Sequence, residues 1–385
     1  MKILIVSPYY PPDSSVAVVR MASLSRHLVT NGHEVSVIRN RIEKGKDFST
    51  QLKIPSGVNT YQVESSVDGS YFKRFHKDYK NYRNKIDGIL SKESFDVVLI
   101  SVGPFHTLPL CKYIKNKFKV KCIIDFRDLW ALDIRDIRDF FKIKKLFARV
   151  ISYSIERSAI KYADKIITVT EGWKNRMMKF YPLYRSKFYL VYNGYDDILL
   201  SDVEANENID YSKNILGVFG KLSYYSREYA NKFFKSVNEL RKEYDLEILQ
   251  VGTLEKDTTN IMDSTNYPKE KFHSTGFINY KDGMRLLSNV RVCILIDIRK
   301  AGLGTKIYDY IYLNKPIIYI GKKNTDLADF INSFENGYVC DTEMEISRAI
   351  DKILRNNIYK LGNAVDHKQF ARSVQNTEFL SIIKN

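Results

Sequence analysis

Short apolar runs alternate with amphipathic helical patterns along almost the whole chain, and this alternation limits the fold more than any other feature. The apolar run Lys2–Ser7 precedes a helical pattern over Ala17–Asn31, which ends at Gly32. Further strand-like runs follow at Glu34–Ile38, Val97–Ser101, Lys121–Phe126 and Lys165–Thr170. Strands that alternate with helices predict a parallel sheet with helices on both faces.

A polar, acidic stretch from Asp196 to Asp210 interrupts this order and is interpreted as a linker. The order then restarts, with strands expected at Asn214–Phe219, Leu246–Val251, Val292–Asp297 and Pro316–Ile320, and helices at Glu228–Glu243 and Tyr308–Tyr312. With 385 residues, the chain exceeds what one hydrophobic core usually serves. We therefore expect an α/β protein of two doubly wound, Rossmann-like domains, with ligands near the carboxyl ends of the strands.

Three features indicate a cytoplasmic protein. The four cysteines, at positions 111, 122, 293 and 340, show no CxxC spacing, so we interpret them as reduced structural thiols and expect no zinc site. No apolar run approaches the roughly 18 residues of a membrane-spanning helix. The short run Ile3–Ser7 is followed by two prolines, which favours a buried strand over a signal peptide.

The segment Gly302–Tyr310 places a glycine turn before a helix, directly after an expected strand. Such a turn presents unpaired N–H groups to a phosphate. Thr305 adds a hydroxyl donor, Lys306 adds a cation, and Asp309 is placed one turn further on, within reach of ribose hydroxyls. The alternative is an ordinary glycine turn in front of a core helix.

The segment Gly217–Leu222 is a strand that ends in Gly220 and Lys221, with Arg227 shortly after it. Two cations at the mouth of a strand-to-helix loop suit a diphosphate, which needs both charge neutralisation and donors. Solvated side chains on a loop are the alternative.

These segments belong to a longer series that follows in one order: ILIVSPYYPPDSSVAVVRMASLSRHLVTNGHEVSVI, DVVLISVGPFHTLPL, IIDFRDLW, RSAIKYADKIITVTEGWKNRM, VYNGYD, GKLSYYSR and GLGTKIYDYIYLNKPII. Together they resemble the family 4 retaining glycosyltransferases of the GT-B fold over nearly the whole chain. The resemblance implies two Rossmann-like domains that face each other across a cleft. Residues 1–195 would bind the acceptor, residues 196–365 would bind the nucleotide sugar, and residues 366–385 would form a helix that packs back on the first domain.

The resemblance also implies roles for residues of the second domain. Lys221 and Arg227 would hold the donor diphosphate, in the loop that begins at Gly220, and by neutralising the leaving group they would carry much of the catalysis. The N–H groups of Gly304 and Thr305 would assist, with Lys306 beside them. Asp309 would bind the ribose, and Ile278 would contact the base through its backbone. No metal or other cofactor is implied, because two cations already cover the diphosphate.

In the first domain, the resemblance points to the loop over Pro11–Val16, where Ser14 and Ser15 would approach the sugar or the acceptor. Arg20 would touch phosphate there, unless it is an outward residue of an amphipathic helix. His106 is a second candidate on an adjacent loop, although a lone histidine is more often structural.

The segment Asp125–Trp130 follows an expected strand, and Asp128 is the candidate for a polar group close to the reacting carbon or the acceptor hydroxyl. A carboxylate there could accept a proton or stabilise positive charge. Arg127 belongs to the same region. The alternative is a structural ion-pair cluster of Asp125, Arg127 and Asp128.

Two positions depart from the family pattern. Ala301 stands where the family often has a glutamate that handles the donor sugar, and Arg299 and Lys300 flank it. Ser14 and Ser15 stand where the family frequently has two glycines. Sugar recognition must therefore differ from that pattern, and the sugar is not assigned.

The formal net charge is +16, which attracts polyanions such as nucleic acid, anionic lipid or phosphorylated small molecules. Residues 72–85 and 140–149 interleave basic and aromatic side chains, which suits an anionic membrane surface. Binding of single-stranded nucleic acid ranks lower because no such motif is visible, and so no nucleic-acid partner is expected. Solvated helices with aromatic core faces are the remaining alternative.

These observations lead to one expectation with two alternatives. By the family resemblance, the chain is expected to move a sugar from a nucleoside diphosphate, UDP in preference to GDP, to a glycan or lipid-linked acceptor with retention, in bacterial surface polysaccharide synthesis. It would work in the cytoplasm, peripherally on the inner face of the membrane. The alternatives are a sugar-nucleotide epimerase of the same fold and an inactive relative that binds membrane or polysaccharide.

Overall fold

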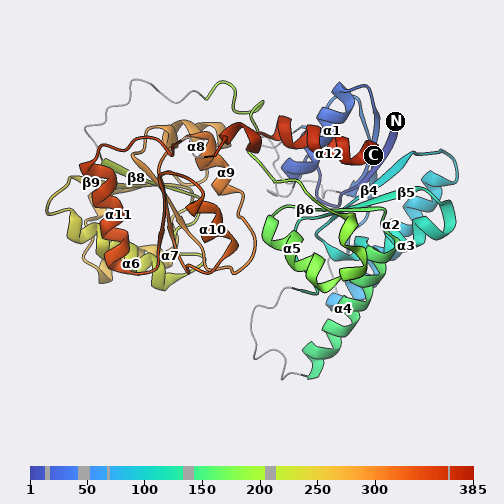
Figure 1. Cartoon of the computed structure of the whole chain (residues 1–385), viewed down its shortest axis with the longest axis horizontal. Coiled ribbons are helices and arrows are strands. Elements are labelled where there is room, and N and C mark those ends of the chain that lie inside the picture. The colour runs from blue at the N-terminus through green and yellow to red at the C-terminus, as the bar shows by residue number, and fades with distance from the viewer. Residues whose placement is uncertain (14–17, 42–52, 67–69, 133–142, 204–213, 363–364) are drawn as a thin grey trace. The chain divides into compact units, whose positions relative to one another are not determined.

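The computed structural model describes residues 1–13, 18–41, 53–66, 70–132, 143–203, 214–362 and 365–385. It divides into two compact units, shown in Figure 1: unit 1 contains Met1–Tyr192 and Ser373–Asn385, and unit 2 contains Asn193–Arg372. The chain passes from unit 1 to unit 2 after Tyr192 and returns after Arg372, close to the predicted domain boundaries at 195 and 366 but not at them. The reason is local, because the N–H of Tyr195 donates to Phe370 (3.0 Å) and that of Arg372 donates to Tyr195 (2.8 Å). Both segments therefore pair with each other inside unit 2.

Unit 1 is built on a seven-stranded parallel sheet of order β3-β2-β1-β4-β5-β6-β7. Its strands are β1 (Lys2–Val6), β2 (Glu34–Asn40), β3 (Val58–Val63), β4 (Val97–Val102), β5 (Lys121–Phe126), β6 (Lys165–Thr168) and β7 (Phe188–Leu190). Its helices are α1 (Val18–Thr30), α2 (Tyr71–Leu90), α3 (Leu108–Phe118), α4 (Ile143–Tyr162), α5 (Glu171–Phe180) and α12 (Arg372–Lys384), with short 3₁₀ turns η1 (Phe105–Thr107) and η3 (Pro182–Lys187).

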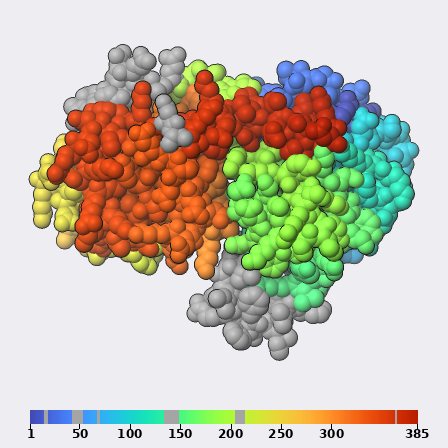
Figure 2. Space-filling view, viewed as in Figure 1, coloured from blue at the N-terminus to red at the C-terminus, as the bar shows by residue number. Residues whose placement is uncertain are grey.

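The C-terminal helix α12 is part of the core of unit 1. Its residues Phe379, Leu380, Ile382 and Ile383 are buried in one cluster with Met21 and other apolar residues of α1 and the sheet. In the space-filling view, α12 (red) lies directly against the surface of this unit (Figure 2). Burial of apolar side chains on this scale anchors the chain end firmly to the first unit.

Unit 2 is built on a six-stranded parallel sheet of order β10-β9-β8-β11-β12-β13. Its strands are β8 (Asn214–Phe219), β9 (Leu246–Val251), β10 (Phe272–Ser274), β11 (Val292–Ile296), β12 (Ile317–Ile320) and β13 (Gly337–Cys340). Its helices are α6 (Arg227–Leu240), α7 (Lys256–Ser264), α8 (Tyr280–Ser288), α9 (Lys306–Tyr312), α10 (Asp326–Asn332) and α11 (Glu343–Arg355), with 3₁₀ turns η4 (Lys269–Lys271) and η5 (His367–Phe370). The α/β class and the doubly wound parallel sheets confirm the prediction.

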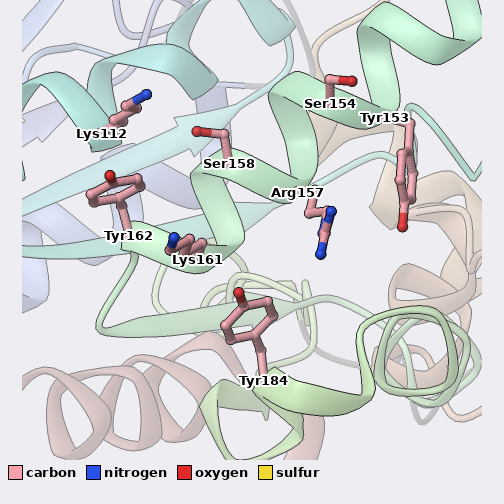
Figure 3. Close-up of a pocket in the computed structure, with 8 residues that line it drawn as sticks. All are labelled: Lys112, Tyr153, Ser154, Arg157, Ser158, Lys161, Tyr162 and Tyr184. Carbon is pink, nitrogen blue, oxygen red and sulfur yellow. The ribbon is translucent and has the colours of Figure 1, made fainter.

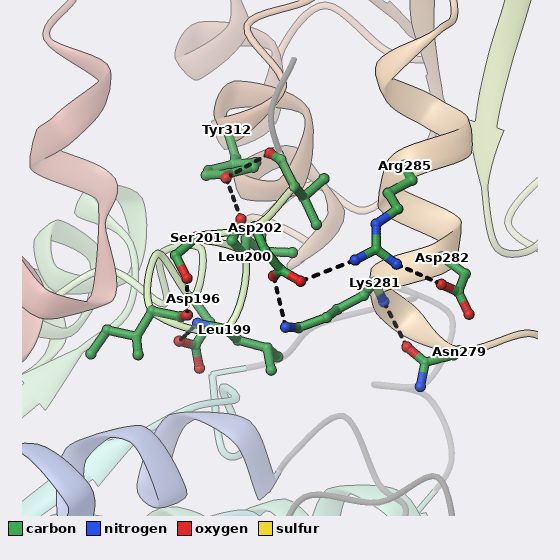
Figure 4. A network of polar contacts seen from close by, with 12 residues as sticks. Asp196, Leu199, Leu200, Ser201, Asp202, Asn279, Lys281, Asp282, Arg285 and Tyr312 are labelled. Atoms are coloured by element: carbon green, nitrogen blue, oxygen red, sulfur yellow. Dashed lines mark hydrogen bonds and ion pairs between the residues drawn. The ribbon is translucent and has the colours of Figure 1, made fainter. Parts of the chain in front are cut away.

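The segment Asp196–Val203, predicted as the start of a linker, packs on unit 2. Leu200 and Val203 are buried, and the Tyr312 hydroxyl lies 2.6 Å and 2.9 Å from their carbonyl oxygens. Asp202 forms ion pairs with Lys281 (2.7 Å) and with Arg285 (3.0 Å), as Figure 4 shows. This part of the chain is therefore an element of unit 2, and the rest of the predicted linker lies outside the described residues.

Among the described helices, none is both long enough and apolar enough to cross a membrane. The four cysteines at positions 111, 122, 293 and 340 are buried free thiols. Burial raises the pKa of Cys340 to about 12, which keeps that thiol protonated and unreactive at neutral pH.

Candidate functional site

The strand order of unit 2 reverses between β8 and β11. These two strands pair with each other, whereas β9 and β10 extend the sheet on one side and β12 and β13 on the other. In doubly wound sheets, ligands bind beyond the carboxyl ends of the strands at such a point. The loops that leave β8 and β11 there contain Gly220, with φ +76°, and Gly302, with φ +99°, both in the region that favours glycine.

Lys306 joins these two loops. A Cβ built on Gly220 would lie 3.0 Å from Lys306 Nζ, and the ammonium is 3.5 Å from the carbonyl oxygen of Lys221. Burial lowers the pKa of Lys306 to about 8, although Glu255, Asp297 and Asp309 act in the opposite direction. A partly desolvated cation beside a glycine backbone is an arrangement that a phosphate would stabilise.

The Gly220–Ser223 loop is held in place by a polar network that sequence reasoning missed. Gln250 donates to the carbonyl of Gly220 (2.8 Å) and to Glu255 (3.0 Å). Glu255 in turn accepts from the N–H of Leu222 (2.8 Å) and from the hydroxyl of Ser223 (3.2 Å). A Cβ on Gly252 would lie 2.7 Å from the Gly220 Cα. These residues could have been predicted as part of the site because they lie at or after the end of β9, on the same edge of the sheet as the Gly220 loop.

Lys221 and Arg227 are both exposed at this edge. The Lys221 ammonium lies 4.6 Å from the ring centroid of Tyr224. Arg227 is the first residue of α6 and lies 3.5 Å from Asp257, with its side chain 64% exposed. An exposed ion pair of this kind contributes little stability, so its exchange for a phosphate partner costs little.

Arg299 lies two residues before Ala301, in the loop after β11. Its guanidinium contacts both carboxylate oxygens of Asp297 at 3.0 Å and stacks over Tyr225 at 4.8 Å from the ring centroid. A Cβ on Gly304 would come within 3.1 Å of Arg299 Nη2. The surroundings of position 301 therefore include a fixed cation.

Two other residues predicted to bind the donor nucleotide have fewer side-chain contacts than Lys306 and Arg299. Thr305 lies at the start of α9, and its side chain makes no capping hydrogen bond there. Ile278 lies in the loop between β10 and α8, half-buried beside Gly283, and its neighbour Phe277 is 83% exposed. This loop leaves the same carboxyl edge of the sheet as the loops of β8 and β11.

Asp309 is buried on α9 and accepts a hydrogen bond from the hydroxyl of Tyr280 (2.5 Å). Burial raises the pKa of Asp309 to about 6, while the Tyr280 hydrogen bond and the charges of Arg372 and Lys306 limit the rise. The predicted ribose carboxylate is therefore positioned by a tyrosine that sequence reasoning did not identify.

Replacing Asp309 with asparagine is expected to stabilise unit 2 at pH 7 by roughly 1–3 kcal/mol, because a pKa raised above its unfolded value means that burying the charged form costs stability. The stability of the wild type should fall as pH rises from about 4 to above 6, and the variant should lack this fall. Calorimetric unfolding at pH 4, 5, 6 and 7 measures the difference. An equal pH dependence in both proteins would contradict the assignment.

In unit 1, Arg20 forms a buried ion pair with Asp125, with Nη2 2.9 Å from Oδ1. Its remaining donors reach the carbonyl oxygens of Tyr192 (2.8 Å) and Val191 (3.1 Å). These protein partners occupy the guanidinium, so the structure does not support the predicted contact with phosphate. Asp125 also pairs here with Arg20 across the fold, which the sequence did not suggest.

His106 is buried against Tyr82 and Phe75, with ring centroids 5.3 Å and 6.5 Å away. Burial lowers the pKa of His106 to about 4, partly offset by the charge of Asp78. The ring is therefore neutral at physiological pH and its packing is that of a core residue, which favours a structural role.

Asp128 and Arg127 follow β5, where Asp128 is exposed and Arg127 half-buried. A Cβ on Gly103 would lie 3.4 Å from Asp128 Oδ2, so the loops after β4 and β5 meet here. The neighbouring Trp130 ring stacks on Phe105 (4.9 Å) and on Phe75 (5.8 Å). Ser14 and Ser15 lie outside the described residues.

The described residues bring together no group of three or more histidine, cysteine, aspartate or glutamate side chains that could hold a metal ion. The prediction that no metal takes part stays a prediction.

Comparisons with known proteins agree with this architecture. Residues 17–198, a little under half of the chain, match the family model described as Glycosyltransferase Family 4. No curated protein sequence matches the chain. Similar solved structures include the UDP-GlcNAc 2-epimerase of Methanocaldococcus jannaschii (16% identity, 100% of this chain and 99% of that chain, TM-score 0.66).

Two further structures are similar over the full length of both chains. One is the UDP-GlcNAc 2-epimerase of Neisseria meningitidis bound to UDP-GlcNAc (14% identity, 100% of each chain, TM-score 0.67). The other is HepE of Anabaena in complex with UDP and glucose (13% identity, 100% of each chain, TM-score 0.64). The chain has the GT-B fold. At these identities, the likeness fixes the fold, while activity has to be argued from the site.

Proposed function

We propose that this protein is a glycosyltransferase that takes a sugar from a nucleoside diphosphate and transfers it to a glycan or lipid-linked acceptor. The observation that carries the proposal is the meeting of two glycine loops at the switch point of unit 2, with Lys306 between them and Lys221 on the rim. Cations beside exposed backbone N–H groups suit a diphosphate. The bound UDP and UDP-sugars of the similar structures support UDP as the first candidate.

In the proposed reaction, Lys221, Lys306 and Arg227 neutralise the charge that develops on the leaving diphosphate. Glu255 and Gln250 hold the Gly220 loop, so the cost of ordering it is met before the donor binds. Asp309, which accepts a hydrogen bond from Tyr280, would accept from ribose hydroxyls. With the diphosphate as proton acceptor, the sugar would transfer with retention and no strong protein base, and Asp128 would orient the acceptor.

The donor site is tested by calorimetric titration of UDP, GDP and their sugars on the wild type and on Lys221→Ala. One nucleotide should bind, and the variant should bind it at least tenfold more weakly, because a charge-assisted contact contributes roughly 1.5–3 kcal/mol. Lys242→Ala is the matched control, since Lys242 is an exposed cation that follows α6. Equal loss in both variants, or none in either, would show that the diphosphate lies elsewhere.

A UDP-sugar 2-epimerase is the second candidate, because two of the similar structures are such enzymes along the whole chain. The two reactions differ in their need for an acceptor. If the protein is an epimerase, proton NMR of UDP-GlcNAc incubated with the protein alone would reveal the 2-epimer or free UDP. UDP release that requires an added glycan or lipid-linked saccharide would support transfer.

We also infer that the acceptor side faces an anionic membrane, in a cytoplasmic, peripheral location. At the start of α2, the aromatic residues Tyr71 and Phe72 and the cations Lys73, Arg74 and Lys77 are exposed. Rings at headgroup level beside cations are typical of membrane-surface helices. The second stretch, 140–149, lies mostly outside the described side chains.

A further inference from the structure

A groove of about 360 Å³ lies in unit 1 between α3, α4 and η3 (Figure 3). It is lined by three cations, three tyrosines and two serines: Lys112, Arg157, Lys161, Tyr153, Tyr162, Tyr184, Ser154 and Ser158. None of these lining residues, all of which are described, is acidic. The groove therefore offers positive charge and hydroxyl donors without a counterion of its own.

The spacing of these residues along α4 explains why they share one surface. Tyr153, Arg157 and Lys161 recur every four residues, as do Ser154 and Ser158, so they form two adjacent rows on one helix face. Lys112 of α3 and Tyr184 of η3 add to the lining. Figure 3 shows Arg157 and Lys161 on α4 above Tyr184, with Lys112 of α3 beyond Ser158.

The acidic residues nearby in the chain are engaged elsewhere. Glu156 is buried, where it accepts from the hydroxyl of Tyr181 (2.7 Å) and from the N–H of Ala131 (3.0 Å). Asp164 pairs with Lys115 (3.0 Å). Within the described part of the chain, no carboxylate lies within ion-pair distance of Lys112, Arg157 or Lys161.

Two further contacts make the groove suitable for an anion. The ammonium groups of Lys112 and Lys161 lie 5.6 Å and 5.8 Å from the ring centroid of Tyr162, so two like charges share one ring. Lys187 donates to the carbonyl oxygens of Lys161 (2.8 Å) and Ala163 (2.6 Å). This cation offsets the negative end of the α4 dipole, which would otherwise disfavour an anion beside it.

We propose that this groove binds the phosphate group of a small phosphorylated ligand, with Arg157 and the two lysines as counterions and the hydroxyls of Ser158 and the tyrosines as donors. The volume exceeds that of a phosphate alone, so the rest of the ligand would contact the tyrosine rings. All residues that line the groove belong to unit 1, whereas the donor loops belong to unit 2. Tyr162 and Tyr184 of the lining precede β6 and β7, at the amino-terminal edge of the sheet, whereas Asp128 follows β5 at its carboxyl edge.

The phosphate can come from a soluble phosphomonoester or from an anionic lipid headgroup, and two measurements separate these sources. In the first, sn-glycerol 1-phosphate is titrated by calorimetry. In the second, the protein is sedimented with vesicles of phosphatidylcholine containing about 30% phosphatidylglycerol, and with vesicles of phosphatidylcholine alone, because anionic lipid attracts surface cations by roughly 1 kcal/mol each. Each is repeated on Arg157→Glu and on Lys161→Ala, with Lys92→Glu as an exposed control cation of the same unit.

Binding in at least one arm is expected, with a tenfold or larger loss in Arg157→Glu, a smaller loss in Lys161→Ala and little change in Lys92→Glu. Binding of the soluble ester assigns a metabolite site, and binding of anionic vesicles alone assigns a headgroup site. The thermal unfolding of each variant shows whether it is folded. The proposal fails if neither arm binds, or if Lys92→Glu weakens binding as much as Arg157→Glu, because the net charge would then be responsible.

Discussion

Replacing Arg20 with methionine is expected to destabilise unit 1 by about 3–5 kcal/mol, because it leaves a buried carboxylate without its partner. The side chains of Arg20 and Asp125 are only 6% and 0% exposed, and Arg20 also holds the carbonyl oxygens of Val191 and Tyr192. These carbonyls lie at the end of the first segment of unit 1. Loss of the guanidinium would therefore also loosen the point where the chain leaves the unit.

The sequence offers a convenient measurement of this effect. The chain has two tryptophans, Trp130 and Trp173, and both belong to unit 1. Tryptophan fluorescence in a urea titration therefore reports the unfolding of unit 1 alone. The double variant Arg20→Met, Asp125→Leu should recover part of the lost free energy of unfolding, since no buried carboxylate then remains without a partner. A loss below about 1 kcal/mol in Arg20→Met would instead favour the ligand-binding role that the sequence suggested.

The strands that alternate with strong helical patterns could be predicted from the sequence, and the short edge strands could not. Buried runs such as Asn214–Phe219 and Lys121–Phe126 match β8 and β5 to the residue. By contrast, β10 has three residues and exposes two of them, so it shows no apolar run. Its pairing with β9 is a tertiary contact that local pattern does not record.

The candidate site divides in a similar way. The glycine loops and their cations are contiguous in sequence, so the pattern itself placed Lys221 at a strand end and Lys306 at the start of a helix. The partners that fix them come from distant strands and helices. Tyr280 lies in a different helix from Asp309, and Glu255 follows a different strand from Leu222. Arg20 and Asp125 are likewise far apart in the chain, and a spacing rule could not join them.

The affinity for the donor nucleotide should depend on pH through Lys306. Its pKa of about 8 in the free protein means that the ammonium is present at pH 7 and is largely lost by pH 9. The diphosphate of UDP keeps a nearly constant charge over this range, because its second ionisation occurs near pH 6. Above pH 8 the protein must take up a proton to bind the diphosphate, and the affinity should fall by up to about tenfold per pH unit.

Lys306→Met tests this directly, because methionine preserves much of the side-chain length and removes the charge. At pH 7 the variant should bind UDP about 10–100-fold more weakly, the loss of one desolvated charge-assisted contact. At pH 9 the difference from the wild type should shrink by about five- to tenfold, since the free wild-type amine is then largely neutral and must take up a proton to bind. Calorimetry at pH 7, 8 and 9, with Lys242→Met as the surface control, gives both numbers. A constant difference across the three pH values would mean that Lys306 keeps its charge and supports the Gly220 loop instead of titrating against the ligand.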